Sequence, residues 1–187
     1  MGNFFKAISQ NPIIAAINDL DKLDKVIQSP CKAVFLLTGN ILDLSFIVSK
    51  LKENAKLVYV HVDLIDGLSK DEVAIKFLNT HVKLDGIITT KANLVKVAKE
   101  LKLFVIQRLF ILDSLALDSG INAVKTTRPN AVEILPGIMP KIIENITSET
   151  NIPVITGGLI KEKEDVISSL KAGAIAISTS NEKVWYM

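Results

Sequence analysis

The chain has 187 residues, a length that suits one domain with a full hydrophobic core. Hydrophobic residues make up 49% and charged residues 22%, which excludes a disordered chain and a coiled coil. The net charge of +2 permits an anionic partner but does not require one. The single cysteine, Cys31, excludes an internal disulfide and a cysteine-based zinc site.

The chain shows no targeting or membrane segment. No stretch approaches the roughly 18 uninterrupted apolar residues of a membrane span, and the first residues lack the apolar run of a signal peptide. We therefore expect a cytoplasmic protein without a membrane contact, and we assign no metal site and no cofactor.

Two periodicities alternate along the whole sequence. Short β-branched runs are each followed by a stretch with helical spacing, such as the stripe of Leu44, Ile47, Val48 and Leu51. The expected strands are residues 13–17, 33–37, 57–62, 86–90, 103–108, 131–135, 152–156 and 174–178.

Strands that are apolar almost throughout predict a parallel sheet covered by helices. Eight right-handed crossovers close such a sheet, so we predict a single-domain α/β protein over residues 1–187, a compact (β/α)₈ TIM-like barrel with parallel strands. The chain is short for this fold, which requires short loops and a minimal helix between Asn18 and Val26. The alternative is an open doubly wound sheet, which would leave two or three runs unassigned.

The ends of the seventh and eighth strands carry the strongest site signal, because ligands of such barrels bind at the carboxyl ends of the strands. Gly157 and Gly158 let the chain approach a ligand closely, and Ser178 and Thr179 add hydroxyl donors. A helix beginning near Asn181 would add its positive N-terminal end. The pattern predicts a phosphate site, the alternative being an ordinary Gly-Gly turn with a Ser/Thr cap.

Other polar residues follow the remaining strands. Asp63 alternates with Tyr59 and His61, so all three share one face. Asp63 is then a general base or hydroxyl acceptor at the mouth, or a cap of its own loop. His61 lies deeper and is expected to be a hydrogen-bonded core histidine.

Arg108 follows a buried run beside Gln107, and burial of a guanidinium requires a partner. That partner is a carboxylate such as Glu133, a ligand anion, or both. Lys91 adds a basic group close to a strand end, whereas Arg128 precedes Pro129 in a loop and is expected to be solvated.

Seven segments, which together cover nearly the whole chain, resemble the glycerol-uptake-operon antiterminator family. They are Asn-Pro-Ile-Ile-Ala-Ala at 11–16, Val-His-Val-Asp-Leu-Ile-Asp-Gly-Leu at 60–68, Asp-Gly-Ile-Ile-Thr-Thr-Lys at 85–91, Gln-Arg-Leu-Phe-Ile-Leu-Asp-Ser at 107–114, Val-Glu-Ile-Leu-Pro-Gly-Ile-Met-Pro-Lys at 132–141, Gly-Gly-Leu-Ile at 157–160 and Ala-Gly-Ala-Ile-Ala-Ile-Ser-Thr-Ser-Asn at 172–181.

The resemblance implies a bacterial transcription regulator that responds to glycerol 3-phosphate. In that family the liganded protein acts on the leader of the glycerol-operon mRNA and lets transcription pass a terminator. The glycine and hydroxyl residues of the last two strands would hold the phosphate, and Asp63, with Gln107 or Glu133, would accept hydrogen bonds from the glycerol hydroxyls. RNA binding would rest on dispersed lysines, and a homodimer through an apolar helix face is expected.

The alternative is an enzyme on the same scaffold. It would act on a small phosphorylated metabolite as an isomerase, an aldolase or a prenyl transferase on a glycerol phosphate, with Asp63 and Glu133 as acid and base and Lys91 as a Schiff-base candidate. Because no two groups recur in a spacing that fixes a reaction type, no catalytic residue is assigned and the regulator is favoured.

Overall fold

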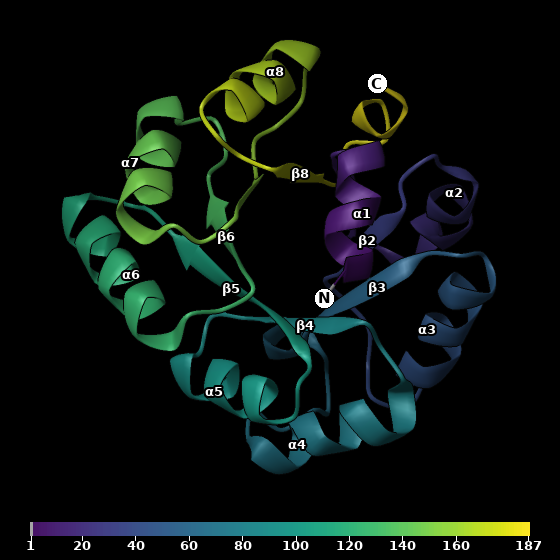
Figure 1. Ribbon diagram of the computed structural model, residues 1–187. Coiled ribbons are helices and arrows are strands. Elements are labelled where there is room, and N and C mark those ends of the chain that lie inside the picture. The colour runs from purple at the N-terminus through teal and green to yellow at the C-terminus, as the bar shows by residue number, and fades with distance from the viewer. Residues whose placement is uncertain (1) are drawn as a thin grey trace.

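The computed structural model describes residues 2–187 and shows a closed barrel of eight parallel strands (Figure 1). Each strand pairs with the next along the chain, and β8 pairs back onto β1. This closure confirms the (β/α)₈ barrel and excludes the open sheet. The strands are β1 Ile13–Ile17, β2 Ala33–Leu36, β3 Leu57–His61, β4 Gly86–Thr89, β5 Phe104–Phe110, β6 Ala131–Leu135, β7 Val154–Gly157 and β8 Ala176–Thr179.

Helices surround the ring and bury the apolar stripes predicted for them, as for Leu44, Ile47, Val48 and Leu51 of α3. The first crossover is minimal, as expected, with one 3₁₀ turn and a six-residue helix. No helix within residues 2–187 is long and apolar enough to cross a membrane. The helical elements are α1 Gly2–Gln10, η1 Leu20–Lys22, α2 Leu23–Gln28, α3 Leu44–Glu53, η2 Val62–Leu64, α4 Glu72–Phe77, η3 Leu78–Val82, α5 Ala92–Glu100, α6 Ser114–Thr127, α7 Pro140–Thr150, α8 Lys163–Lys171 and η4 Val184–Tyr186.

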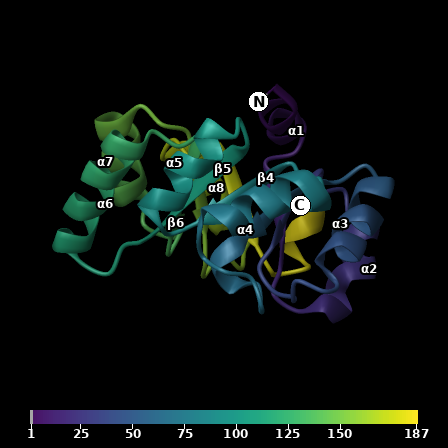
Figure 2. The ribbon, with the colours of Figure 1, turned by 90° about the horizontal axis from the view of Figure 1, so that it is seen from below.

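Helix α1 was not predicted from the sequence. It lies beyond the N-terminal ends of the strands, on one end of the barrel (Figure 2). Its Phe4 is buried against Tyr59 and Phe104, with ring centroids 5.1 and 4.8 Å apart. The helix therefore closes this end of the barrel with aromatic side chains.

The barrel interior changes from apolar to polar along its axis. Near α1 it is filled by residues such as Ile14, Phe35 and Ile155. Toward the carboxyl ends of the strands, the side chains of Arg108 and Glu133 take over. This polar layer is the floor of the candidate site.

Six of the eight strands begin or end one or two residues away from the predicted bounds, and only the bounds of β1 and β6 are as predicted. Two differences affect the site. Strand β5 continues to Phe110, so Gln107 and Arg108 lie within it rather than at its end. The helix expected near Asn181 is a single 3₁₀ turn that begins at Val184, because a turn at residues 182–183 precedes it.

Candidate functional site

A cavity of about 430 Å³ opens at the carboxyl ends of β7 and β8. Its rim is built by the connection after β7, residues 158–161, and by residues 178–181 at the end of β8. Arg108 and Glu133 lie on its floor and Leu135 on its wall. The two strand ends that the sequence singled out therefore meet at one cavity.

Glu133 is the centre of the floor. Its carboxylate has no solvent contact, and its Oε2 accepts a hydrogen bond of 2.6 Å from Arg108 Nε. The hydroxyl of Ser178 donates to Oε1. The internal Arg108–Glu133 pair considered in the sequence analysis is thus present. Arg108 also lines the cavity, so its two remaining guanidinium nitrogens lie beside the space that a ligand would fill.

Gly157 lies beneath this network instead of on the cavity wall. A Cβ at residue 157 would stand 2.5 Å from Ser178 Oγ and 2.9 Å from Glu133 Oε1. A side chain there would displace the Ser178–Glu133 hydrogen bond. Gly157 therefore permits the close packing of the floor, whereas Gly158, in the left-handed region at φ 75°, lines the cavity itself.

The hydroxyls of the rim are engaged within the protein. Thr179 Oγ1 donates to the carbonyl of Ile160 and accepts from the Asn181 N–H. The side chain of Asn181 donates to the carbonyl of Lys161. These bonds join the two connections that form the rim, so Ser178 and Thr179 shape the site and their hydroxyl protons are not free for a ligand.

Main-chain donors and one lysine remain available for an anion. Within residues 2–187, the N–H groups of Gly158 and Ser180 have no hydrogen-bond acceptor, and the Lys161 ammonium has no carboxylate partner. All three residues line the cavity. N–H groups that converge next to a cation are the usual means of binding a phosphate.

Three predicted mouth residues lie elsewhere. Gln107 points out of the barrel, opposite to Arg108, and its Oε1 accepts from Thr127 of α6 at 2.6 Å. Asp63 accepts from the hydroxyl of Thr89 and from the N–H and hydroxyl of Thr90, so it caps the connection after β4 and not its own loop. Lys91 precedes α5 and does not line the cavity.

His61 is buried, as expected, but its Nδ1 finds no hydrogen-bond partner within residues 2–187. The nearest carboxylate oxygen, Asp63 Oδ2, lies 4.0 Å away. Burial and the charge of Arg108 lower the pKa of His61 to about 4, so the ring is neutral at pH 7.

The sequence analysis missed one support of the site, Lys161, and did not identify the bond that Trp185 makes. Lys161 directly follows the Gly-Gly-Leu-Ile segment, where a basic residue after a glycine turn is a usable signal. Trp185 is fully buried and donates from its indole N–H to the carbonyl of Thr179 at 2.8 Å. This bond anchors the second rim connection from the C-terminal side.

The family model described as glycerol-3-phosphate responsive antiterminator matches residues 13–185, which include every strand and the whole cavity. The chain belongs to this family. A relative from Escherichia coli K12, the uncharacterized protein YgcP, is 42% identical over 178 residues, covering 95% of this chain and 93% of that protein.

Two solved structures of the antiterminator family are also similar. A glycerol uptake operon antiterminator regulatory protein from Listeria monocytogenes is 36% identical, covers 94% of this chain and 95% of its own, and superposes with a TM-score of 0.91. An antiterminator-related protein from Thermotoga maritima is 38% identical, with coverages of 94% and 98% and a TM-score of 0.84. Likeness to a deoxyribose-phosphate aldolase, at 11% identity and a TM-score of 0.71, shows the barrel fold alone.

Proposed function

We propose that this antiterminator-family chain binds glycerol 3-phosphate in the cavity at the carboxyl ends of β7 and β8. We propose further that the liganded protein acts on the leader mRNA of a glycerol operon and regulates glycerol uptake genes. The observation that supports the ligand is the pairing of unused main-chain donors at Gly158 and Ser180 with the Lys161 ammonium. The antiterminator family supports the RNA target.

In this proposal the two ends of the ligand meet different parts of the cavity. The phosphate lies on the rim, against the Gly158 and Ser180 N–H groups and Lys161. The glycerol hydroxyls lie on the floor, where the guanidinium of Arg108 donates to them while Glu133 holds Arg108 in place. Gln107, Asp63 and Lys91 take no part, because each lies outside the cavity.

Ligand binding would act through the rim. The phosphate would hold residues 158–161 and 180–183 together. The Thr179–Ile160 hydrogen bond already joins these two connections, and Trp185 anchors the second one through the Thr179 carbonyl. The ligand shifts the equilibrium between the loose and the tightened rim only if it binds the tightened rim more strongly. We expect a coupling free energy of about 1–3 kcal/mol between ligand binding and RNA binding.

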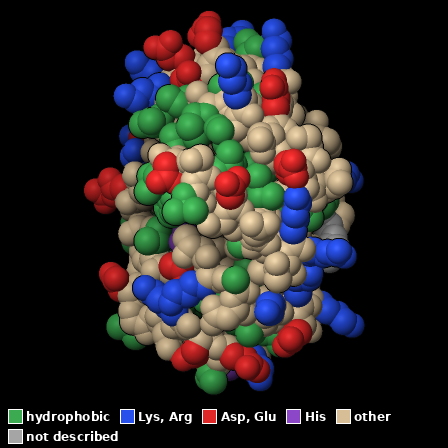
Figure 3. All heavy atoms as spheres, turned by 90° about the vertical axis from the view of Figure 1, so that its left-hand side faces the viewer, with side chains coloured by type: hydrophobic (Ala, Val, Ile, Leu, Met, Phe, Trp, Pro, Cys, Tyr) green, Lys and Arg blue, Asp and Glu red, His purple; other side chains and the backbone are tan. Residues whose placement is uncertain are grey.

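We infer that the protein works in the cytoplasm as a homodimer. Support comes from an apolar patch, defined as Phe110, Leu112, Leu115, Ile138 and Leu159, whose side chains are exposed. Figure 3 shows hydrophobic side chains gathered on the side of α6 and α7, toward the end opposite α1. Contiguous exposed apolar surface of this kind marks an interaction site.

An enzyme on a phosphorylated metabolite is the other candidate. The regulator is favoured because the Glu133 carboxylate already accepts from Arg108 and Ser178, and because the other two candidate groups, Asp63 and Lys91, lie outside the cavity. Incubation with glycerol 3-phosphate should therefore leave it unconverted. Turnover would favour the enzyme.

Calorimetry tests the ligand. Glycerol 3-phosphate should bind at least about a hundredfold more tightly than glycerol, since charge-assisted bonds to the phosphate are absent in glycerol. Lys161→Gln should weaken glycerol 3-phosphate binding, whereas Lys163→Gln, an exposed lysine in α8, should not. Equal affinity for both compounds would reject the phosphate site. Binding of the leader RNA with and without ligand then tests the gating, and an affinity indifferent to ligand would reject it.

A further inference from the structure

The two ends of the barrel carry opposite charges. The connections from strand to helix, at the cavity end, are mainly acidic, with Asp19, Asp43, Asp66, Asp71, Asp113 and Glu162. At the opposite end, five of the six charged residues in the connections from helix to strand are basic: Lys32, Lys56, Lys83, Asp85, Lys102 and Arg128. Lys56 is buried and donates to the carbonyls of Ser29 and Cys31, and exposed Glu53 and Glu100 end the adjoining helices α3 and α5. The positive surface charge of these connections therefore comes from Lys32, Lys83, Lys102 and Arg128.

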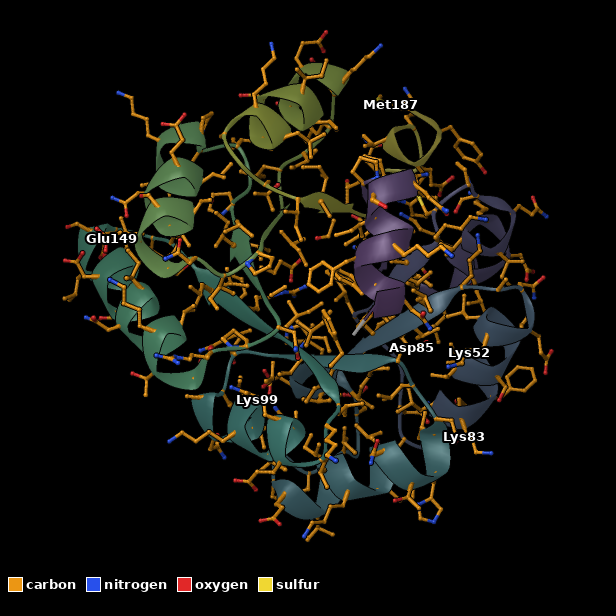
Figure 4. All side chains as sticks on the ribbon, in the orientation of Figure 1. Lys52, Lys83, Asp85, Lys99, Glu149 and Met187 are labelled. Carbon is orange, nitrogen blue, oxygen red and sulfur yellow. The ribbon has the colours of Figure 1, made fainter. Side chains whose placement is uncertain are left out.

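The acidic residue of these connections, Asp85, is bonded within the protein. Asp85 accepts from Lys52 at 3.0 Å with one oxygen and from the Val58 N–H with the other (Figure 4). By contrast, Lys83, Lys102 and Arg128 are exposed, and within residues 2–187 none of their side chains forms an ion pair. Figure 3 shows Lys and Arg side chains along the right-hand edge, the end that α1 covers.

These three residues occupy backbone positions where glycine is usual. Lys83, Lys102 and Arg128 have φ angles of 55°, 57° and 49°, each at or just after the end of a helix. Left-handed positions at helix ends favour glycine or asparagine. The negative end of a helix dipole attracts a cation already in the last turn, so it does not require a long basic side chain at the left-handed position. The crossovers before β4, β5 and β6 nevertheless each have a long basic side chain at the left-handed position.

A hollow adjoins Arg128. It lies between the carboxyl ends of α6 and α7, has a volume of about 480 Å³, and is lined by Val124, Arg128, Asn151 and Ile152 among others. A guanidinium plane on which a base can stack, and an amide that can hydrogen-bond to its edge, are among the contacts that proteins make with an unstacked nucleobase.

From the basic end and its hollow we propose that this face of the barrel binds the RNA. Lys83 and Lys102 contact the phosphate backbone, and the hollow beside Arg128 receives an unpaired base. The proposal rests on the RNA-directed function proposed above and names the surface that performs it. Because the ligand cavity opens at the other end of the barrel, RNA and glycerol 3-phosphate bind without competing.

The decisive variant replaces all three residues by glycine, K83G, K102G and R128G in the full chain. Glycine removes the charges and suits the left-handed backbone, so the variant should melt no lower than the wild type. The matched control is K70Q, K96Q and K163Q, three exposed lysines elsewhere on the surface without ion pairs within residues 2–187. Glycerol 3-phosphate affinity should be unchanged in both proteins.

The readout is fluorescence anisotropy with the leader transcript of the glycerol operon from the protein's own genome, at saturating glycerol 3-phosphate, across a salt series. The glycine variant should bind at least about tenfold more weakly. Its salt slope should fall by about 1.4, because each of the two lost phosphate contacts to single-stranded RNA contributes about 0.7. The single variant R128K keeps the charge but loses the planar guanidinium, so it should weaken binding at an unchanged salt slope.

The outcomes separate this proposal from the function on which it rests. If the wild type binds the leader and the glycine variant binds equally well, or if the lysine control loses as much affinity, the RNA face lies elsewhere and the antiterminator function stands. If the wild type does not bind the leader in the presence of glycerol 3-phosphate, the proposed function fails, and this surface assignment fails with it.

Discussion

At the scale of single residues, the carboxylate of Glu133 is tolerated inside the barrel only because Arg108 and Ser178 both donate to it. Removing one member of a buried ion pair leaves the other charge uncompensated. Glu133→Gln should therefore lower the free energy of unfolding by about 3 kcal/mol, measured by urea denaturation. The expected loss lies at the lower end of the usual range because Arg108 also faces the cavity, where water reaches it.

Two comparisons make the Glu133 prediction specific. Glu144→Gln, at an exposed position of α7, should change the stability by less than about 0.5 kcal/mol. Adding Arg108→Met to Glu133→Gln should recover at least half of the loss, because the uncompensated charge is then gone. A double variant as unstable as the single one would mean that the floor is held by packing and not by charge.

His61 gives the protein a predictable pH dependence. Its pKa is about 4 in the folded state against an ordinary value of 6.5. Between these pH values the unfolded chain binds a proton that the folded chain does not, so stability falls as the pH drops from 7 toward 4. The loss at pH 4.5 should be about 2–3 kcal/mol, obtained from urea denaturation at both pH values.

The comparison protein for this measurement is His61→Asn. Hydrogen bonds also lower the pKa values of exposed carboxylates such as Asp71 and Glu149, so their protonation in acid destabilises the folded protein as well. This contribution is the same in the wild type and in His61→Asn. The variant should therefore show a shallower fall between pH 7 and 4.5. Parallel pH profiles would show that His61 is protonated in the folded protein.

The residue types in the sequence indicated where the candidate site lies, but they did not indicate in which direction each side chain points. Gln107 and Arg108 are neighbours in sequence, and both suggested a polar mouth, yet a strand directs them to opposite faces. Gln107 was assigned to the mouth because two adjacent polar residues suggested that the strand ends there. Strand β5 instead continues through both residues to Phe110. Ser178 and Thr179 line the cavity, but the partners that engage their hydroxyls come from distant strands and loops.

At the scale of elements, α1 adds a closing layer that is not part of the repeated unit. Its Phe4 is buried among the rings of Tyr59 and Phe104. Phe4→Ala should lower the free energy of unfolding by about 3–4 kcal/mol, since the cavity left behind is walled by rigid strands.

Phe46 supplies the matched control for Phe4, because its side chain in α3 is 71% exposed. Phe46→Ala should cost less than about 0.5 kcal/mol in the same urea titration. Equal losses in the two variants would show that α1 does not seal the barrel.

The eight strands could be predicted because each is apolar over most of its length and lies between helical stripes, so one pattern repeats around the ring. Helix α1 has only Phe4, Ala7 and Ile8 as its buried stripe and lies outside that repeat. Its burial depends on Tyr59 and Phe104 at the end of the barrel that α1 covers, and these residues become neighbours only after the ring closes. Local periodicity contains no such information.

At the scale of the whole molecule, the ligand cavity and the apolar patch share a residue. Leu159 lines the cavity and is also 59% exposed in the patch. Leu112 and Leu115, the most exposed members at 84% and 73%, lie on the connection after β5 and on the first turn of α6, two strands around the ring from Leu159. A second copy packed on this patch would therefore respond to a ligand that holds residues 158–161.

This shared residue predicts that glycerol 3-phosphate changes the dimer affinity. In sedimentation equilibrium the wild type should show a monomer–dimer equilibrium whose dissociation constant shifts by about 5- to 150-fold with ligand. Leu112→Asp with Leu115→Asp should give a monomer, because charges are then buried at the contact. Leu42→Asp, at a leucine that is 88% exposed on the connection before α3, should still dimerise. By linkage, the monomeric variant should bind glycerol 3-phosphate with the affinity of the wild type at high dilution. A wild-type chain that stays monomeric at every concentration, with and without ligand, would exclude this patch as a contact between copies.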